Sequence, residues 1–187
     1  SCGSCHACRR GEPINCDAYT FLGYFGFGPK SKEVFKEYPY AGFGEYMTAP
    51  ASSLIKLPNN MSFEEGARLG YVGTAYSALR KAGTRAGQSV LIHGATGTLG
   101  LGAVLLALGM GATKVFAVAR NVELLKRVKA LDPRRVETLS IEGEKHAAIA
   151  GWVRDHTDGL GADIFIDAVG PGTSNVVSLA GIDALRR

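Results

Sequence analysis

The sequence has no apolar run long enough to span a membrane, no marked excess of charge and no visible signal peptide. Its longest apolar stretch covers 14 residues, from Leu99 to Ala112, whereas a membrane-spanning helix needs about 20. The net charge is only +4, and the basic cluster at 126–135 lacks the interleaved aromatic residues of a nucleic-acid-binding surface. We therefore expect a cytoplasmic protein that binds neither membranes nor nucleic acid.

Disorder is also excluded, because 46% of the 187 residues are hydrophobic and 20% are charged, as in globular proteins with a buried core. The four cysteines all lie in residues 1–16. Residues 17–44, rich in Gly, Phe, Tyr and Pro, are expected to be irregular, and short extended pieces are expected at Glu45–Ala49 and Ser53–Leu57. We expect residues 1–61 to form a unit distinct from residues 62–187.

From Ser62 onward, helix and strand patterns alternate about every 25 residues. The sequence Ser62-Phe63-Glu64-Glu65 is a capping box, and it opens a helix that we expect to break near Gly70 or Gly73 and resume to Lys81. The other predicted strands are Gln88–His93, Lys114–Ala119, Val136–Leu139 and Asp163–Val169. The other predicted helices are Leu99–Met110, Asn121–Leu131, Glu144–His156 and Ser174–Leu185. This alternation predicts an α/β fold with a parallel sheet and helices on both faces.

The cysteines follow the spacing C-x2-C-x2-C-x7-C, at Cys2, Cys5, Cys8 and Cys16. Such close spacing lets one loop bring four thiolates around a single zinc ion. One alternative is a disulfide framework, which would need an oxidising compartment. Another is an iron–sulfur cluster, but the bacterial ferredoxin run ends in C-x3-C-P, whereas the last gap here is seven residues and Asp17 follows Cys16. Zinc is therefore favoured over both alternatives. Because four thiolates leave no open coordination position, the expected zinc is structural and not catalytic.

A glycine-rich turn joins the strand ending at His93 to the helix that follows. Ala95, Gly97 and Gly100 form an A-x-G-x-x-G variant of the dinucleotide-binding fingerprint, in which small residues admit a diphosphate to the helix N-terminus. A tight turn without a ligand is the alternative. The expected cofactor contacts at this turn are Ala95, Thr96, Gly97, Thr98, Leu99 and Gly100.

The end of the second strand indicates which dinucleotide binds. NAD sites place an acidic residue about 20 positions after the turn, but this sequence has Ala119 and Arg120 there. Ala119 leaves room for a 2′-phosphate, and the guanidinium of Arg120 can pair with it bidentately. NADP is therefore predicted in preference to NAD, although NAD stays possible. The alternative is that Arg120 is simply exposed to solvent.

Taken in order, these motifs resemble the medium-chain dehydrogenase/reductase superfamily, and within it the zinc-type alcohol dehydrogenase branch. The resemblance is carried by Cys2–Cys16, Gly42–Tyr46, Leu57-Pro58, Ser62–Ala67, Gly73–Tyr76, Gly94–Gly100, Gly161–Asp163 and Asp167–Gly170. It implies a Rossmann-type NAD(P)-binding domain over 62–187. Over 1–61 it implies a structural zinc lobe and the remnant of a GroES-like catalytic domain. It further implies that the sequence is a fragment, lacking two upstream catalytic zinc ligands and the last strands of the nucleotide sheet.

The resemblance also implies an activity, which is hydride transfer between NADP(H) and a small alcohol, aldehyde or ketone by a homo-oligomer. Thr74 resembles the threonine that contacts nicotinamide, with a helix-capping hydroxyl as the alternative. Val169 lies at the carboxyl end of a strand and is a further candidate cofactor contact, although a plain core position is the favoured interpretation.

One position departs from the branch and leaves the catalytic residues unassigned. Gly70 stands where the branch commonly has a cysteine ligand for catalytic zinc. The sequence therefore does not decide whether the protein binds a catalytic zinc ion. A zinc-free quinone or enoyl reductase and a non-catalytic nucleotide- and zinc-binding fragment are the alternative functions. In a zinc-free reductase Tyr71 or Tyr76 could donate a proton, but a buried structural role is the favoured interpretation of both tyrosines.

Overall fold

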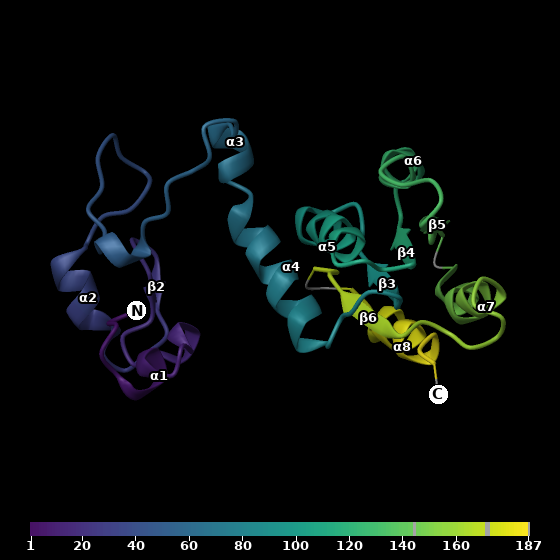
Figure 1. Cartoon of the computed structure of the whole chain (residues 1–187), viewed down its shortest axis with the longest axis horizontal. Helices are drawn as coiled ribbons and strands as arrows, with labels where there is room; N and C mark the ends of the chain where they lie inside the picture. The colour runs from purple at the N-terminus through teal and green to yellow at the C-terminus, as the bar shows by residue number, and fades with distance from the viewer. Residues whose placement is uncertain (144, 171–172, 187) are drawn as a thin grey trace. The chain divides into compact units, whose positions relative to one another are not determined.

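The computed structural model describes residues 1–143, 145–170 and 173–186, and the chain separates into two compact units, Ser1–Asn60 and Met61–Arg187. Figure 1 traces both units from the N-terminus to the C-terminus. None of the described helices is both long and apolar enough to cross a membrane.

The second unit is built on a parallel four-stranded sheet with the strand order β5-β4-β3-β6 (Figure 1). The strands are β3 (Ser89–His93), β4 (Lys114–Ala119), β5 (Val136–Ser140) and β6 (Ile164–Asp167). Each coincides with a predicted strand, but β6 is shorter than the predicted Asp163–Val169. Asp163 lies before β6 and uses its carboxylate to accept hydrogen bonds from Ser89, while Val169 lies in the loop after β6.

The helices of this unit are α3 (Phe63–Gly66), α4 (Leu69–Lys81), α5 (Thr98–Gly109), α6 (Val122–Lys129), α7 (Ala148–Asp155) and α8 (Asn175–Asp183). Asn121 and Ser174, the first residues of two predicted helices, are the N-caps of α6 and α8, and the side chain of each accepts a hydrogen bond from a first-turn amide. The predicted helix Glu144–His156 begins instead with a 3-10 turn at Lys145–Ala147, and Glu144 lies outside the described residues.

Two hydrophobic cores cover the two faces of the sheet, as the α/β prediction requires. On one face, Val90 and Ile92 of β3 pack with α4, α5 and α6. On the other, Leu91 of β3 packs with Phe116 of β4 and Ile149 of α7. Successive residues of a strand point to opposite faces, so a strand buried on both sides is apolar throughout. The sheet is thus covered by helices on both faces.

The capping box at Ser62 is confirmed, because the Ser62 hydroxyl accepts from the Glu65 amide while the Glu65 carboxylate accepts from the Ser62 amide. The predicted break near Gly70 or Gly73 is wrong, since both glycines lie inside α4. The interruption falls earlier, between α3 and α4. Helix α4 packs against α5, where a Cβ on Gly102 would lie 3.6 Å from the Val72 Cα. This packing compensates for the low helix propensity of glycine.

The favoured interpretation of Tyr71 and Tyr76 as buried aromatics is also wrong. Tyr71 is 53% exposed and Tyr76 is 45% exposed. Tyr76 accepts a hydrogen bond from Arg80, one helical turn further along α4. The two rings lie on the outer surface of α4 because its inner face is taken by Ala75 and Leu79, which are fully buried.

The first unit contains more regular structure than the sequence predicted. Its elements are α1 (His6–Arg9), a 3-10 turn at Pro13–Asn15, β1 (Thr20–Phe21), β2 (Phe25–Gly26), α2 (Ser31–Glu37) and a 3-10 turn at Ala51–Ser53. The predicted irregular region 17–44 therefore holds a hairpin, whose rings Phe21 and Phe25 meet edge to face at 5.8 Å. The extended pieces predicted at 45–49 and 53–57 form no strand among the described residues.

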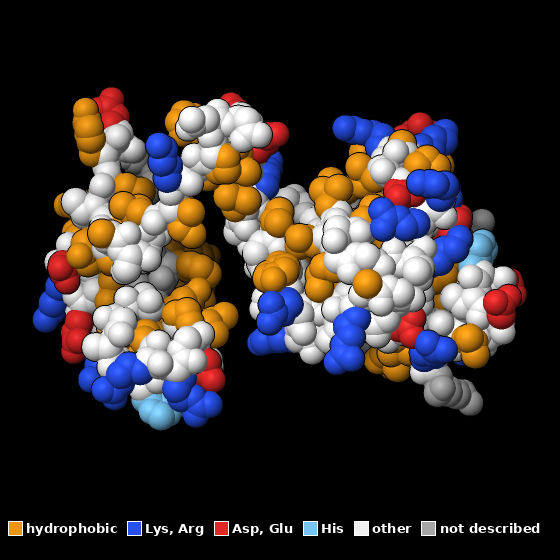
Figure 2. Space-filling view, in the orientation of Figure 1, with side chains coloured by type: hydrophobic (Ala, Val, Ile, Leu, Met, Phe, Trp, Pro, Cys, Tyr) orange, Lys and Arg blue, Asp and Glu red, His pale blue; other side chains and the backbone are white. Residues whose placement is uncertain are grey.

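The basic cluster at 126–135 is largely neutralised by nearby carboxylates. Lys126 pairs with Glu123, Lys129 with Glu137, and Arg135 with Asp132. Figure 2 likewise shows acidic side chains between the basic ones around α6. Paired charges attract polyanions less than a continuous basic patch does.

Candidate functional site

The glycine turn after β3 has a backbone shape that requires small residues. Gly94 has a φ of 70°, and a Cβ there would lie 2.7 Å from the Ala168 carbonyl oxygen. A Cβ on Gly100 would lie 2.1 Å from the Gly94 carbonyl oxygen. No side chain caps the start of α5, where Gly97 is the N-cap. The first-turn amides of α5 therefore remain available to an anion.

A cleft of about 520 Å³ lies at the carboxyl ends of the parallel strands. This is the edge at which open α/β sheets bind ligands. All four strands of the sheet contribute to it, through the segment that follows each one. The lining residues are Gly94, Thr96, Gly97, Ala119, Arg120, Asn121, Ile141, Gly143, His146, Ala168, Val169, Gly170, Thr173, Ser174 and Val177. Five of the predicted cofactor contacts are among them: Thr96, Gly97, Ala119, Arg120 and Val169.

The other predicted contacts do not line this cleft. Ala95 is fully buried in the core, Leu99 packs against that core, and Gly100 is buried beneath the turn. Thr98 is exposed as the first residue of α5. Of the six contacts predicted at the turn, only Thr96 and Gly97 therefore line the cleft.

Thr74 lies within α4, exposed to solvent, and its hydroxyl donates a hydrogen bond to the Gly70 carbonyl at 3.0 Å. This bond is local to the helix and is not the N-terminal cap given as the alternative. Val169 is half-buried at the cleft wall, where its amide donates to the Asp167 carboxylate. The favoured interpretation of Val169 as a plain core residue is therefore wrong.

Arg120 is exposed to solvent at the edge of the cleft. Its backbone carbonyl accepts a hydrogen bond from the Ser140 hydroxyl at 3.1 Å, which fixes the main chain next to β5. Within residues 1–143, 145–170 and 173–186, its guanidinium has no ion-pair partner. The neighbouring Asn121 carboxamide accepts from the Leu124 amide and so caps α6. The guanidinium can thus reach a ligand in the cleft.

Two histidines near the cleft were missed by the sequence analysis. His93 is fully buried at the end of β3, and neither of its ring nitrogens has a hydrogen-bond partner in the described chain. Burial lowers the pKa of His93 to about 4, against an opposing effect of the Asp167 carboxylate and with a further decrease from His146. The available signal was a polar residue that ends an otherwise apolar strand just before the glycine turn. His146 lines the cleft, and its sequence context carried no such signal.

The four cysteines meet in the first unit, with sulfur atoms all within 4.8 Å of one another. The Cys2 and Cys16 sulfurs are 3.6 Å apart, close to the edge of about 3.8 Å that a tetrahedral ZnS₄ site with Zn–S of about 2.3 Å requires. Amides donate to these sulfurs, among them Cys5 N–H to Cys2 at 3.3 Å and Ala18 N–H to Cys16 at 3.3 Å. The residues present fit a zinc ion, while His6 is exposed and is not needed as a ligand.

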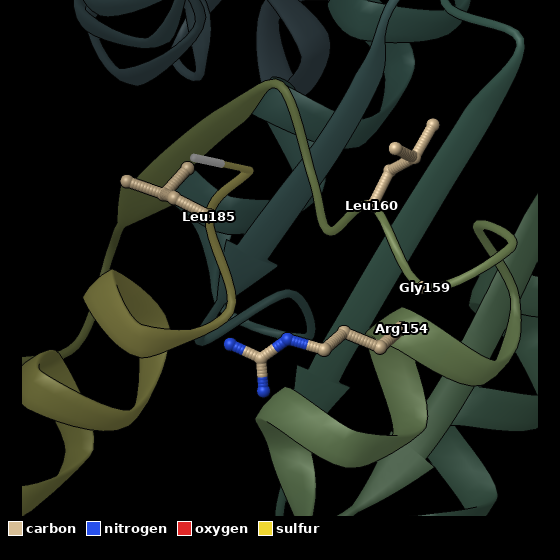
Figure 3. A pocket seen from close by; sticks show the side chains of 4 residues that line it. All are labelled: Arg154, Gly159, Leu160 and Leu185. Carbon is tan, nitrogen blue, oxygen red and sulfur yellow. The ribbon is translucent and has the colours of Figure 1, made fainter.

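A second cavity of about 450 Å³ lies at the opposite, amino end of β6. It is lined by Arg154, Gly159, Leu160 and Leu185. Figure 3 shows the Arg154 side chain extending from α7 toward the end of α8, where its guanidinium donates to the Asp183 carbonyl. Among the described residues, this lining contains no carboxylate, histidine or nucleophile.

No protein-family model matches the chain. It is 33% identical over 165 residues to an alcohol dehydrogenase from Geobacillus stearothermophilus, with 88% of this chain and 43% of that protein covered. It is 35% identical over 131 residues to an uncharacterized zinc-type alcohol dehydrogenase-like protein from Escherichia coli, with 70% of this chain and 34% of that protein covered. The chain therefore spans less than half the length of these curated relatives.

Solved structures show the same likeness. A NAD-dependent alcohol dehydrogenase has a TM-score of 0.76 at 30% identity, with 100% of this chain and 48% of that chain covered. A mycobacterial protein complexed with NADPH has a TM-score of 0.62 at 28% identity, with 76% of this chain and 42% of that chain covered. Because the likeness in sequence and in fold extends over most of its length, the chain belongs to the zinc-type alcohol dehydrogenases of the medium-chain dehydrogenase/reductase superfamily.

Proposed function

We propose that the cleft of the second unit binds NADP(H), and that the protein transfers a hydride between this cofactor and an alcohol or carbonyl substrate. The observation that carries the proposal is the Arg120 guanidinium, which has no ion-pair partner among the described residues and lies at the edge of a cleft. The same cleft contains the N-terminus of α5, which no described side chain caps. An anionic diphosphate and a 2′-phosphate would each meet a positive partner there.

When bound, the nicotinamide ring supplies the hydride chemistry, and the protein supplies binding and orientation. The amides at the start of α5 would hold the diphosphate against Gly97. Arg120 would hold the 2′-phosphate, with Ala119 leaving the space beside it. Val169 and Gly170, after β6, would form the opposite wall. Each contact fixes the cofactor across the carboxyl edge of the sheet, where a substrate domain can reach it.

We further propose that Cys2, Cys5, Cys8 and Cys16 bind one structural zinc ion. The distances between their sulfurs and the amide donors around them support this assignment. A zinc ion bound by four thiolates has no open position for substrate, so its contribution is to the folding of the first unit.

The cofactor proposal is tested by changing Arg120 to Ala and measuring the dissociation constants of NADPH and NADH by fluorescence titration. A charged hydrogen bond contributes about 1.5–3 kcal/mol, so NADPH affinity should fall roughly 10- to 150-fold while NADH affinity changes little. Arg127→Ala is the matched control, because Arg127 is an exposed arginine on α6 that does not line the cleft. Equal weakening of both cofactors by Arg120→Ala would refute the 2′-phosphate assignment.

Gly70 favours a second candidate, a zinc-free quinone or enoyl reductase. It lies on the exposed surface of α4 and has no side chain with which to ligate a metal. Metal analysis of the purified protein separates the two candidates. Two zinc ions per full-length chain support alcohol dehydrogenation, and a single zinc supports the zinc-free reductase. A protein that turns over NADPH with neither a carbonyl nor an activated alkene would be the non-catalytic relative.

A further inference from the structure

The four cysteines of the first unit differ in their exposure to solvent. Cys2 is exposed, Cys5 and Cys8 are half-buried, and Cys16 is buried, with 3% of its surface exposed. A thiol that binds zinc is deprotonated, and the thiolate is the form that reacts with oxidants. In a zinc-loaded site all four sulfurs would therefore be thiolates, and they would differ in access. A small oxidant in the solvent meets Cys2 first.

The exposed Cys2 is in direct contact with the buried Cys16. Their sulfur atoms lie 3.6 Å apart, and the Cys2 amide donates a hydrogen bond to the Cys16 sulfur at 3.2 Å. The sulfur atoms in a disulfide are about 2.05 Å apart, so these two must approach each other by only about 1.5 Å. All four sulfurs lie within 4.8 Å of one another. The pairing of Cys2 with Cys16 therefore depends on exposure and on this contact, and not on closeness alone.

We propose that Cys2 and Cys16 form a peroxide-responsive thiol pair, whose oxidation to a disulfide releases zinc from the first unit. The Cys2 thiolate attacks one oxygen of hydrogen peroxide, the O–O bond breaks, and Cys2 becomes a sulfenic acid as hydroxide leaves. The Cys16 thiolate then attacks the Cys2 sulfur, which forms the S–S bond and expels a second hydroxide. Two electrons pass from the two thiolates to the peroxide, and two protons from solvent convert the hydroxides to water.

The disulfide would leave only Cys5 and Cys8 as thiolate ligands. Structural zinc sites have four protein ligands, so two thiolates hold the metal too weakly to retain it. The binding energy of a structural zinc ion contributes to folding, and its loss should lower the melting temperature of the first unit. A dithiol reductant cleaves the disulfide by exchange and restores the ligands. This inference rests on the proposed zinc site, because it requires a bound zinc ion.

The test adds hydrogen peroxide to the zinc-loaded whole chain and follows zinc release with a chromogenic chelator. Each chain should lose one zinc ion and two free thiols, and a dithiol reductant with added zinc should restore both. The remaining thiols are then alkylated, and the tryptic peptides are analysed by mass spectrometry. Trypsin separates residues 1–9 from residues 11–30. The disulfide should join these two peptides, with alkyl groups on Cys5 and Cys8.

Cys2→His and Cys8→His are matched variants, because histidine can replace one thiolate as a zinc ligand. Both variants should retain zinc. Cys2→His should slow the release of zinc by peroxide severalfold, since it removes the exposed thiolate. Cys8→His keeps Cys2 and Cys16 and should release zinc at nearly the rate of the unchanged chain. The peptide map of the unchanged chain is a readout that does not depend on the folding of either variant.

The outcomes separate this inference from the proposed zinc site. If the unchanged chain holds one zinc ion that peroxide does not release, the thiol pair is refuted and the zinc site stands. The same conclusion follows if Cys2 or Cys16 carries the alkyl group after oxidation, because the disulfide then joins other cysteines. Equal slowing by Cys2→His and Cys8→His would also overturn the role of Cys2. If the purified chain holds no zinc, both proposals fail.

Discussion

The buried imidazole of His93 should make the second unit sensitive to mild acid. Its pKa is lowered by burial to about 4, from an ordinary value of 6.5. The unfolded chain therefore takes up a proton before the folded chain does, and stability falls as the pH drops from 6.5 toward 4. This lowering of the pKa corresponds to about 3 kcal/mol of unfolding free energy, of which about 2 kcal/mol is lost between pH 7 and pH 5. The total free energy of unfolding of a small domain is only about 5–15 kcal/mol, so this loss is a large part of it.

The prediction is tested with His93→Leu, which replaces the imidazole by a side chain of similar size that cannot be protonated. Neither ring nitrogen has a hydrogen-bond partner in the described chain, so this change should cost little at pH 7. Between pH 7 and pH 5 the unchanged chain should lose about 2 kcal/mol more than the variant. The carboxylates of Asp132 and Asp163 have lowered pKa values and titrate below this range.

Urea unfolding at both pH values provides the measurement. The single tryptophan, Trp152, lies in α7 and reports on the second unit. The unfolding midpoint should be compared and not the signal amplitude, because the His156 ring lies 5.4 Å from the indole and can alter its fluorescence. If unchanged chain and variant lose the same free energy between pH 7 and pH 5, His93 is not a buried neutral histidine and the reasoning is refuted.

Three further predictions concern the turn, the zinc site and the edge of the sheet. Gly100→Ala should lower the free energy of unfolding by about 1–3 kcal/mol and weaken cofactor binding, because the added Cβ meets a backbone oxygen at 2.1 Å. The control is Gly109→Ala in the same helix, where nothing lies within 4 Å of the added Cβ. In thermal melts this control should raise the stability by about 0.5–1 kcal/mol. Cys8→Ser should abolish zinc binding in metal analysis and lower the melting temperature of the first unit, and retained zinc with unchanged melting would contradict the four-thiolate site. Asp163→Asn should lower the free energy of unfolding in urea by about 2 kcal/mol, because the Asp163 carboxylate accepts two hydrogen bonds from Ser89 and pairs with Arg186. A loss below about 0.5 kcal/mol would show that these contacts of Asp163 contribute little to stability.

The structure confirms the sequence predictions wherever the local pattern and the final packing agree. The middle residues of β3 (90–92) and β4 (115–118) are all apolar because both faces of these strands are buried, and this leaves the same pattern in the sequence. The turn at Gly94–Gly100 is equally predictable, since a Cβ at Gly94 or at Gly100 would meet a backbone oxygen. The first unit was predicted less well, because its hairpin and its α2 helix have no long periodic pattern.

The sequence by itself determined the α/β order, the glycine turn and the cysteine spacing, because each depends on residues within one short stretch of chain. Only the tertiary structure decided that α4 continues through Gly70 and Gly73, since contact with α5 overrides local propensity. It alone also brought His146 and Arg120 to one cleft, and buried His93 beneath the turn. These features arise because parallel strands that are far apart in the sequence end at the same edge of the sheet. A pattern within one short stretch of sequence cannot show which strand ends come together.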